Sequence, residues 1–365
     1  MSLWVVVGGQ FGSEGKGKVS AFITLKENID ICVRCGGPNS GHTFVDEDGE
    51  NKILRQLPTG YVNPHTRLLI PAGALIDPSV VENEMESFGI HPPRVGIDEK
   101  CFVIREGDRE NERALGLRER LSSTLCGVGA AVSRRVLRGA DAKLARDAVG
   151  EYPWLEELLT NVSGEVNRAI DRDKTVLIEG TQGFGLSLYH SEYYPHTTSR
   201  DTSAAGFLSE VGVSPKLVTE IVLVFRTFPI RVAGAQAGPL KDEISWEQLR
   251  MESDYPYDIT EMTSVTNKVR RVARFDWELA HAAVRINRPT RLAINGLDYL
   301  AYASFGCTQA ESLPEKATAF VAEVERELAT PVGYLGVGPS LDHTIVRGVC
   351  EELTNPRASE VNLFR

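Results

Sequence analysis

Short apolar runs alternate with amphipathic stretches along most of the chain. The apolar runs lie at 3–7, 31–35, 67–72, 101–105, 175–180, 221–225 and 291–296. Between several of them, apolar residues recur at helical spacing, at 153–171, 275–287 and 317–329. Uninterrupted apolar strands separated by amphipathic helices predict an α/β fold, with a mainly parallel central sheet flanked by helices on both faces.

Polar, glycine-rich segments follow several of the predicted strands. They lie at 34–43, 180–206, 231–239, 261–276 and 333–340. Ligands of such folds bind at the carboxyl ends of the strands, so we expect these segments to form the active site. No repeat or linker divides the chain, which predicts one domain over 1–365 with a charged helical subdomain at about 98–150.

Composition and charge narrow the class of protein. The 365 residues are 42% hydrophobic and 25% charged, as in ordinary globular proteins, and the formal net charge is −10. This charge argues against a nucleic-acid or anionic membrane partner, because either would need a basic surface. No apolar run is long enough to span a membrane, and the first residues do not resemble a signal peptide, so we expect a cytoplasmic protein.

Cysteine usage indicates reduced thiols. Of the six cysteines, only Cys32 and Cys35 lie close together in the sequence. A disulfide framework is not expected in so long a chain, and a zinc site would need a second pair. We therefore expect Cys32 and Cys35 to be buried thiols at a strand end.

The segment from Gly12 to Lys18, GSEGKGK, has the GxxxxGK spacing of a phosphate-binding loop. It lies between the first predicted strand and a predicted helix, so that backbone N–H groups and the helix dipole can bind phosphate. Lys16 and Lys18 would add positive charge. The hydroxyl residue that usually follows the last lysine and binds magnesium is Val19 here. The segment thus predicts a P-loop-like site of unusual type, with a plain strand-to-helix turn as the alternative.

Several motifs occur together in a fixed order. They are QFGSEGKGK, GGPNSGHTFV at 36–45, EGTQGFGLSLYHSEYYPHTTSRDTSAAG at 179–206, VTNKVRRVARFD at 265–276, NGLDYL at 295–300 and GVGP at 336–339. In order and spacing they resemble the adenylosuccinate synthetase family over nearly the whole chain. The resemblance implies that family's fold and a Mg²⁺-dependent ligase that joins L-aspartate to the 6-position of a purine nucleotide, after a triphosphate has phosphorylated the 6-oxygen.

The resemblance also implies the catalytic and metal-binding positions. His42 would stabilise the oxygen being phosphorylated, as a protonated imidazole beside a developing oxyanion does. Lys16 would act on the phosphates, and Ser13 occupies the place of the family's catalytic aspartate. The implied magnesium ligands are Ser13 and the carbonyl of Gly41.

The implied triphosphate site is large. It comprises Gly12, Ser13, Glu14, Gly15, Lys16, Gly17, Lys18, Gly41, His42, Thr43, Arg270, Asn295, Gly296, Leu297, Asp298, Gly336, Val337, Gly338 and Pro339.

The implied monophosphate and aspartate sites share the loop at 265–271. The monophosphate site comprises Ser13, Asn39, Ser40, Gly41, His42, Ser123, Thr124, Arg138, Gln182, Thr198 and Lys268. In the family the residue matching Arg138 comes from the neighbouring subunit, which implies a homodimer. The aspartate site comprises Val265, Thr266, Asn267, Lys268, Val269, Arg270 and Arg271, in which arginines would clamp carboxylates.

Three positions depart from the family pattern. Most members have Asp at the position of Ser13, and a serine has neither the charge nor the basicity to accept the proton of the purine ring. Asn267-Lys268 replaces a Gly-Arg pair whose Arg contacts the ribose hydroxyl region, which would suit a deoxyribonucleotide. Gly296 replaces a Lys whose stem packs on guanine, which puts GTP selectivity in doubt.

These departures resemble a phage-associated branch of the family that acts on dGMP on the way to 2-aminoadenine nucleotides. We therefore predict a ligase that uses dGMP, L-aspartate and ATP or dATP, in which Ser13 makes room for the 2-amino group of guanine. The group that takes the ring proton stays open between Glu14, a phosphate oxygen and water. The alternatives are conventional synthesis from IMP with GTP, and a non-catalytic nucleotide-binding regulator or simple NTPase.

Overall fold

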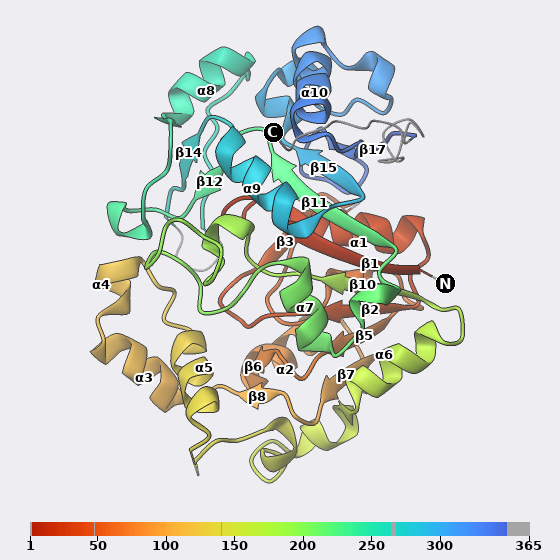
Figure 1. Cartoon of the computed structure of the whole chain (residues 1–365), viewed down its shortest axis with the longest axis vertical. Coiled ribbons are helices and arrows are strands. Elements are labelled where there is room, and N and C mark those ends of the chain that lie inside the picture. Colours follow the sequence, from red (N-terminus) through yellow and green to blue (C-terminus); the bar gives the residue numbers. More distant parts are fainter. Residues whose placement is uncertain (1, 47, 140, 264–267, 349–365) are drawn as a thin grey trace, which may run out of the picture.

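A ten-stranded sheet forms the centre of the computed structural model, which describes residues 2–46, 48–139, 141–263 and 268–348 (Figure 1). The strand order is β17-β16-β15-β11-β1-β10-β2-β5-β7-β9, and every pairing is parallel except that of β16 with β17. The prediction of a mainly parallel sheet is confirmed. The strands are β1 (Ser2–Gly8), β2 (Ile31–Arg34), β5 (Arg67–Ile70), β7 (Val95–Asp98), β9 (Leu159–Thr160), β10 (Thr175–Glu179), β11 (Glu220–Arg226), β15 (Arg291–Asn295), β16 (Val332–Gly336) and β17 (Thr344–Val346).

Helices cover both faces of this sheet, as predicted. Alternate residues of β1 point to opposite faces, so that Leu3, Val5 and Val7 join one buried cluster while Trp4 and Val6 join another. The first cluster includes α6 (Val162–Ile170), α7 (Ala204–Val211), α9 (Trp277–Asn287) and α10 (Glu315–Leu328). The second includes α1 (Lys16–Lys26) and α2 (Pro78–Ser87).

Smaller elements stand at the edges. Three small sheets have the strand orders β12-β14-β13, β3-β4 and β6-β8. Helices α3, α4 and α5 form a charged arm at one corner, and α8 lies at another (Figure 1). The bounds are β3 (His42–Val45), β4 (Asn51–Leu54), β6 (Leu75–Ile76), β8 (Phe102–Val103), β12 (Ile230–Arg231), β13 (Glu243–Ile244), β14 (Arg271–Ala273), α3 (Glu106–Ala114), α4 (Leu117–Leu121), α5 (Val128–Leu137) and α8 (Trp246–Ser253).

Three predicted elements differ from the structure. The helix expected over 153–171 is a 3-10 turn (Pro153–Leu158), strand β9 and helix α6. The break occurs at Asn161, whose side chain accepts a hydrogen bond from the Gly164 amide at 2.8 Å and so starts a new helix. The run at 101–105 forms only the two-residue strand β8, and β16 extends into the segment expected to be a loop from 333. None of the described helices is long and apolar enough to cross a membrane.

Candidate functional site

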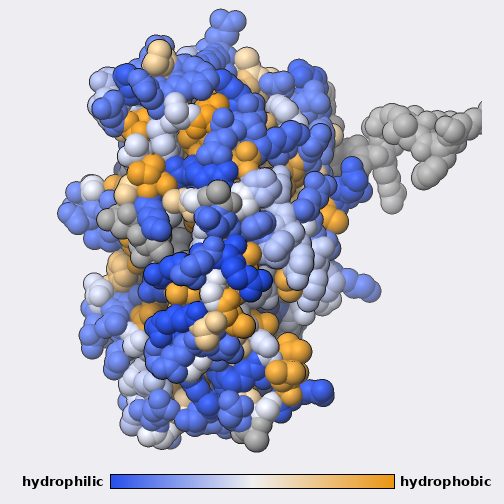
Figure 2. All heavy atoms as spheres, turned by 90° about the vertical axis from the view of Figure 1, so that its left-hand side faces the viewer, coloured by the Kyte–Doolittle hydropathy of each residue, from blue (hydrophilic) through white to orange (hydrophobic). Residues whose placement is uncertain are grey.

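One cavity of about 1350 Å³ lies where the loops after β1, β2, β10, β11 and β15 meet. These strands are neighbours in the sheet, and their parallel direction brings their carboxyl ends to the same edge. The face that carries α3, α4 and α8 at the left of Figure 1 is mainly hydrophilic, and its apolar side chains gather only in small separate groups (Figure 2). The cavity therefore lies at the carboxyl ends of the central strands, where the scaffold holds the loops in place.

Most of the predicted site residues line this cavity. They are Gly12, Ser13, Glu14, Gly15, Lys16, Gly17, Lys18, Asn39, Ser40, Gly41, His42, Thr43, Ser123, Thr124, Gln182, Thr198, Lys268, Arg270, Asn295, Gly296, Asp298, Gly338 and Pro339.

Other predicted site residues do not line it. Leu297 and Val337 are buried in the core, and Gly336 and Val269 also lie off the cavity wall. Arg271 lies in β14, where its guanidinium pairs with Glu243 at 2.5 Å. Arg138 is exposed at the end of α5. Val265, Thr266 and Asn267 lie outside the described residues.

The glycine-rich loop closes around the Glu14 carboxylate. One carboxylate oxygen accepts hydrogen bonds from the amides of Gln10 (2.9 Å) and Gly12 (2.8 Å), and the other pairs with Lys16 Nζ at 2.8 Å. The side-chain amide of Asn295 donates to the Glu14 carbonyl at 2.7 Å, which ties the loop to the end of β15. Because both carboxylate oxygens are already bonded, Glu14 is a poor candidate for the acceptor of the ring proton.

Lys18 holds the loop after β16 against the cavity. Its ammonium group donates to the carbonyls of Gly338 (2.6 Å) and His343 (2.8 Å), so that the loop after β16 is anchored on α1. Burial lowers the pKa of Lys18 to about 7, with Asp298 acting in the opposite direction. This lysine can therefore gain or lose a proton near neutral pH.

Two arginines meet at Ser13. Arg270 Nη1 donates to the Ser13 hydroxyl, and Arg226 Nη1 donates to the Ser13 carbonyl at 3.0 Å. Arg226 also pairs with Glu261 at 2.6 Å, and the Tyr299 hydroxyl donates to the same carboxylate at 3.0 Å. Burial opposes ionisation of Glu261, but Arg226 outweighs it and lowers the pKa of that carboxyl. An ionised Glu261 balances one guanidinium, which leaves an excess positive charge beside Ser13 for an anionic substrate.

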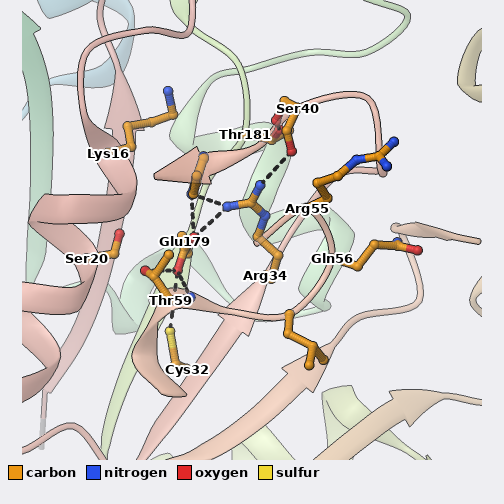
Figure 3. A network of polar contacts seen from close by, with 12 residues as sticks. Lys16, Ser20, Cys32, Arg34, Ser40, Arg55, Gln56, Thr59, Glu179 and Thr181 are labelled. Carbon is orange, nitrogen blue, oxygen red and sulfur yellow. Dashed lines mark hydrogen bonds and ion pairs between the residues drawn. The ribbon is translucent and has the colours of Figure 1, made fainter. Parts of the chain in front are cut away.

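A buried charge network around Glu179 contacts His42, and Figure 3 shows its members Arg34, Thr59 and Ser40. Glu179 pairs with Arg34 Nη1 at 2.5 Å and with His42 Nδ1, while its second oxygen accepts from the amide (2.9 Å) and hydroxyl (2.7 Å) of Thr59. Arg34 also donates to the Ser40 carbonyl at 3.3 Å. The loop that carries Ser40 and His42 is thus fixed to the ends of β2 and β10.

In the substrate-free chain, the charge of His42 is set mainly by burial. Burial, and then Arg34, lowers the pKa of His42 to about 3, although Glu179 acts to raise it. The imidazole is therefore neutral in the absence of substrate, and the expected protonated form would need a bound anion to supply the missing stabilisation. Its Nε2 is buried without a hydrogen-bond partner among the described residues. That nitrogen is the atom left for a ligand.

Sequence reasoning missed the charged residues that support this site. Arg34 ends β2, Glu179 ends β10 and Arg226 ends β11. A single charged residue at the carboxyl end of an apolar strand was the available signal, because it stands where ligands of α/β folds bind. Arg118 and Arg120 of α4 also line the cavity and were not expected there.

Comparison with protein families gives one match. The family model for adenylosuccinate synthetase matches residues 5–146 and 140–305. Two archaeal relatives, both adenylosuccinate synthetases, are similar over nearly their full lengths. That of Thermococcus sibiricus is 41% identical over 350 residues, covering 94% of this chain and 98% of its own. That of Methanocaldococcus jannaschii is 41% identical over 349 residues, covering 93% and 95%.

Two solved structures share the fold. The fully ligated adenylosuccinate synthetase of Plasmodium falciparum has a TM-score of 0.82 at 21% identity, covering 95% of this chain and 100% of its own. The succinoaminodeoxyadenylate synthetase (PurZ) of cyanophage S-2L, bound to dGMP and dATP, has a TM-score of 0.79 at 26% identity, covering 97% and 98%. These matches confirm the fold predicted from the sequence motifs.

Proposed function

The chain belongs to the adenylosuccinate synthetase family, whose members are Mg²⁺-dependent carbon–nitrogen ligases, and we propose that its purine substrate is dGMP. ATP or dATP would phosphorylate the 6-oxygen, and L-aspartate would then replace the phosphate. The product would be N6-succino-2-amino-2′-deoxyadenylate, a precursor of 2-aminoadenine nucleotides for modified phage DNA.

The observation that carries this proposal is the environment of Ser13. Its side chain is half-buried, lines the cavity and already receives a hydrogen bond from Arg270. A serine oxygen has two lone pairs, so it can accept a second hydrogen bond from the 2-amino group of guanine. A carboxylate here would pair with Arg270 and reach further into the cavity, where that amino group must lie.

The cyanophage enzyme supports this choice of substrates, because it binds dGMP and dATP and has the same fold. The archaeal relatives favour a second candidate, conventional adenylosuccinate synthesis from IMP with GTP, because their identity to this chain is higher. A simple NTPase would be indicated by nucleotide hydrolysis that does not depend on aspartate, and a non-catalytic regulator by nucleotide binding without turnover.

The residues of the cavity would act in two steps. The 6-oxygen of the base attacks the γ-phosphorus, the bond from that phosphorus to the β,γ-bridging oxygen breaks, and the N1 proton passes to a phosphate oxygen or to water. Lys16 and the backbone of the glycine-rich loop would hold the phosphates. His42, protonated once the bound substrate anion raises its pKa, would donate to the 6-oxygen from Nε2. The aspartate amine then attacks C6, the C6–O bond breaks, phosphate leaves, and the nitrogen gives up a proton.

The magnesium ion would be held mainly by the substrates. No cluster of three or more acidic, histidine or cysteine side chains suited to a metal occurs in the described part of the chain. Mg²⁺ often has few protein ligands and takes the rest from phosphates and water, so the carbonyl of Gly41 fits this role. The Ser13 hydroxyl fits it less well, because it faces the Arg270 guanidinium. The ion would neutralise charge on the transferring phosphate.

Arg138 would complete the site of a second copy. It is exposed and does not line the cavity of its own chain. We expect Arg138→Ala and His42→Ala to be nearly inactive alone and to regain activity when mixed, because a mixed dimer has one site with both residues. No recovery on mixing would argue against sharing of the site.

The decisive test is product formation with L-aspartate and Mg²⁺, offering dGMP or IMP crossed with ATP or GTP. We expect an aspartate-dependent succinyl product from dGMP with ATP. Ser13→Asp should lower kcat/KM for dGMP on the order of a hundredfold, as loss of space and a wrong hydrogen-bond pattern do. Ser13→Ala, which removes the hydroxyl and keeps the space, should lower it only about tenfold. Product from IMP with GTP alone would establish the conventional reaction, and unchanged dGMP turnover in Ser13→Asp would remove the role of Ser13.

A further inference from the structure

The cavity end opposite His42 holds a buried carboxylate with one oxygen already bonded. Asp298 follows β15, is 4% exposed and lines the cavity. Its Oδ2 accepts a hydrogen bond of 2.7 Å from the hydroxyl of Tyr255. Tyr255 also lines the cavity and comes from the segment between α8 and β14, which the sequence motifs did not single out.

Tyr255 is held firmly in this position. Its ring packs against Tyr302 (4.7 Å between centroids), Tyr257 (5.3 Å) and Tyr299 (5.7 Å). Burial, and then Asp298, raises the pKa of the Tyr255 hydroxyl, so it stays protonated and remains a donor. The contact between Tyr255 and Asp298 is therefore a fixed part of the cavity wall.

An aromatic face and a proline stand beside this pair. Phe305 is 37% exposed and lines the cavity, and its ring is supported by Tyr302 (5.6 Å, nearly parallel) and by His343 (4.9 Å). Gly338 and Pro339 line the same region, and Lys18 anchors Gly338 on the helix that follows the phosphate-binding loop. Phe305 and Pro339 thus offer an aromatic ring and a proline to a planar base whose phosphates lie in that loop.

Guanine and adenine differ in the hydrogen-bond donors that they can present to the Asp298 carboxylate. The edge of guanine presents two neighbouring donors, N1–H and the 2-amino group, and both oxygens of a free carboxylate could accept them. Adenine presents one donor group at this edge, its 6-amino group. When one carboxylate oxygen accepts from a buried tyrosine, guanine would leave a donor unpaired, which is costly in a buried site.

We infer that Tyr255 sets the base selectivity of the triphosphate site, by occupying one oxygen of Asp298 and leaving the other for the 6-amino group of adenine. The inference rests on the proposed function in one respect, that the base of the triphosphate lies beside Asp298. It adds Tyr255 and Phe305 as residues that contact the base, and it explains selectivity without the lysine that Gly296 replaces.

The test measures binding of adenylyl and guanylyl imidodiphosphate by calorimetry, with full-length chain, Mg²⁺ and no monophosphate. Wild type should bind the adenylyl analogue at least about tenfold more tightly. Tyr255→Phe keeps the ring and releases the carboxylate oxygen, so the affinity ratio should shift toward the guanylyl analogue by about tenfold, equal to about 1.4 kcal/mol. Tyr302→Phe is the matched control from the same ring cluster and should leave the ratio unchanged.

Either of two results would overturn the inference: an unchanged ratio in Tyr255→Phe, or an equal shift in Tyr302→Phe. Wild-type preference for the guanylyl analogue would overturn it as well. If Tyr255→Phe does not fold, Asp298→Asn serves instead, because its amide would repel the 6-amino group and should weaken adenylyl binding at least tenfold. None of these measurements contains dGMP, so the monophosphate proposal stands or falls separately on product formation.

Discussion

Two parts of the site are built differently: the buried support of His42, formed by Arg34 and Glu179 and named the floor, and the cavity wall around Ser13, formed with Arg226 and Glu261 and named the rim. In the floor, the Arg34 and Glu179 side chains are 2% and 0% exposed and lie at the ends of central strands. In the rim, the Arg226 and Glu261 side chains are 10% and 28% exposed, and Ser13 and Glu261 lie on loops. A change in the floor leaves a buried charge unpaired, whereas a change in the rim can be compensated by neighbouring polar groups. The rim is therefore where selectivity can change while the chemistry is kept.

The largest effect is expected in the floor. Glu179→Gln should lower kcat on the order of a hundredfold, because His42 loses the partner that orients its ring. The same change leaves Arg34 buried without its counter-charge, which should destabilise the protein by about 3–5 kcal/mol. Steady-state kinetics and urea unfolding measure the two effects.

The matched control for this change is Glu165→Gln. Glu165 also pairs with an arginine, Arg67 at 2.8 Å, but both side chains are about a quarter exposed. Glu165→Gln should lower the free energy of unfolding by only about 0–1 kcal/mol and leave kcat unchanged. If both variants behaved alike, burial of the Arg34–Glu179 pair would not explain the effects of Glu179→Gln.

The next effect separates two adjacent arginines, of which Arg270 lines the cavity and Arg271 does not. Arg270→Met should lower kcat/KM for aspartate on the order of tenfold to a hundredfold, because a charge-assisted contact to an anionic substrate disappears. Arg271→Met should change it by less than about threefold, since Arg271 pairs with Glu243 outside the cavity. Equal losses in the two variants would mean that Arg271 turns toward the substrate during catalysis.

A smaller effect concerns the pH dependence of triphosphate binding. The pKa of Lys18 is about 7 in the free chain, and a bound polyanion should raise it because negative charge favours the ammonium form. Binding at pH 8 should therefore take up protons, and affinity should fall by at most about tenfold per pH unit above pH 7. Calorimetry in two buffers of different ionisation enthalpy measures the uptake, which should vanish in Lys18→Met. Equal uptake in that variant would assign the proton to another group.

The smallest effect is expected at Gly296. Its φ of +78° is left-handed, and a Cβ there would lie 3.0 Å from the Thr227 hydroxyl. Gly296→Lys should therefore destabilise the chain by about 1–2 kcal/mol. It should not raise the use of GTP, because we assign the selectivity for adenine to Tyr255. A thermal melt and the ratio of ATP to GTP turnover measure both. A gain in GTP use would show that the lysine alone decides.

Sequence reasoning predicted the sheet and most of the cavity wall, because apolar strands and glycine-rich loops are local signals. It could not predict that Arg271 turns away, since Glu243 is distant in the sequence and only the fold brings the two together. Tyr255 was missed for the same reason, because its partner Asp298 lies 43 residues further on. The resting charge of His42 could not be predicted either, because burial, which lowers its pKa, is a property of the fold.

The hydrogen bond from the Asn295 side chain to the Glu14 carbonyl also constrains how this cavity can evolve. A Cβ added at Gly15 would lie 2.7 Å from its amide nitrogen, and one added at Gly336 would lie 1.9 Å from its amide oxygen. Neither glycine can accept a side chain while Asn295 is present, and Asn295 cannot be lost without releasing Glu14. Gly15, Asn295 and Gly336 are therefore expected to be inherited as one block, although the two glycines lie nearly the full length of the chain apart.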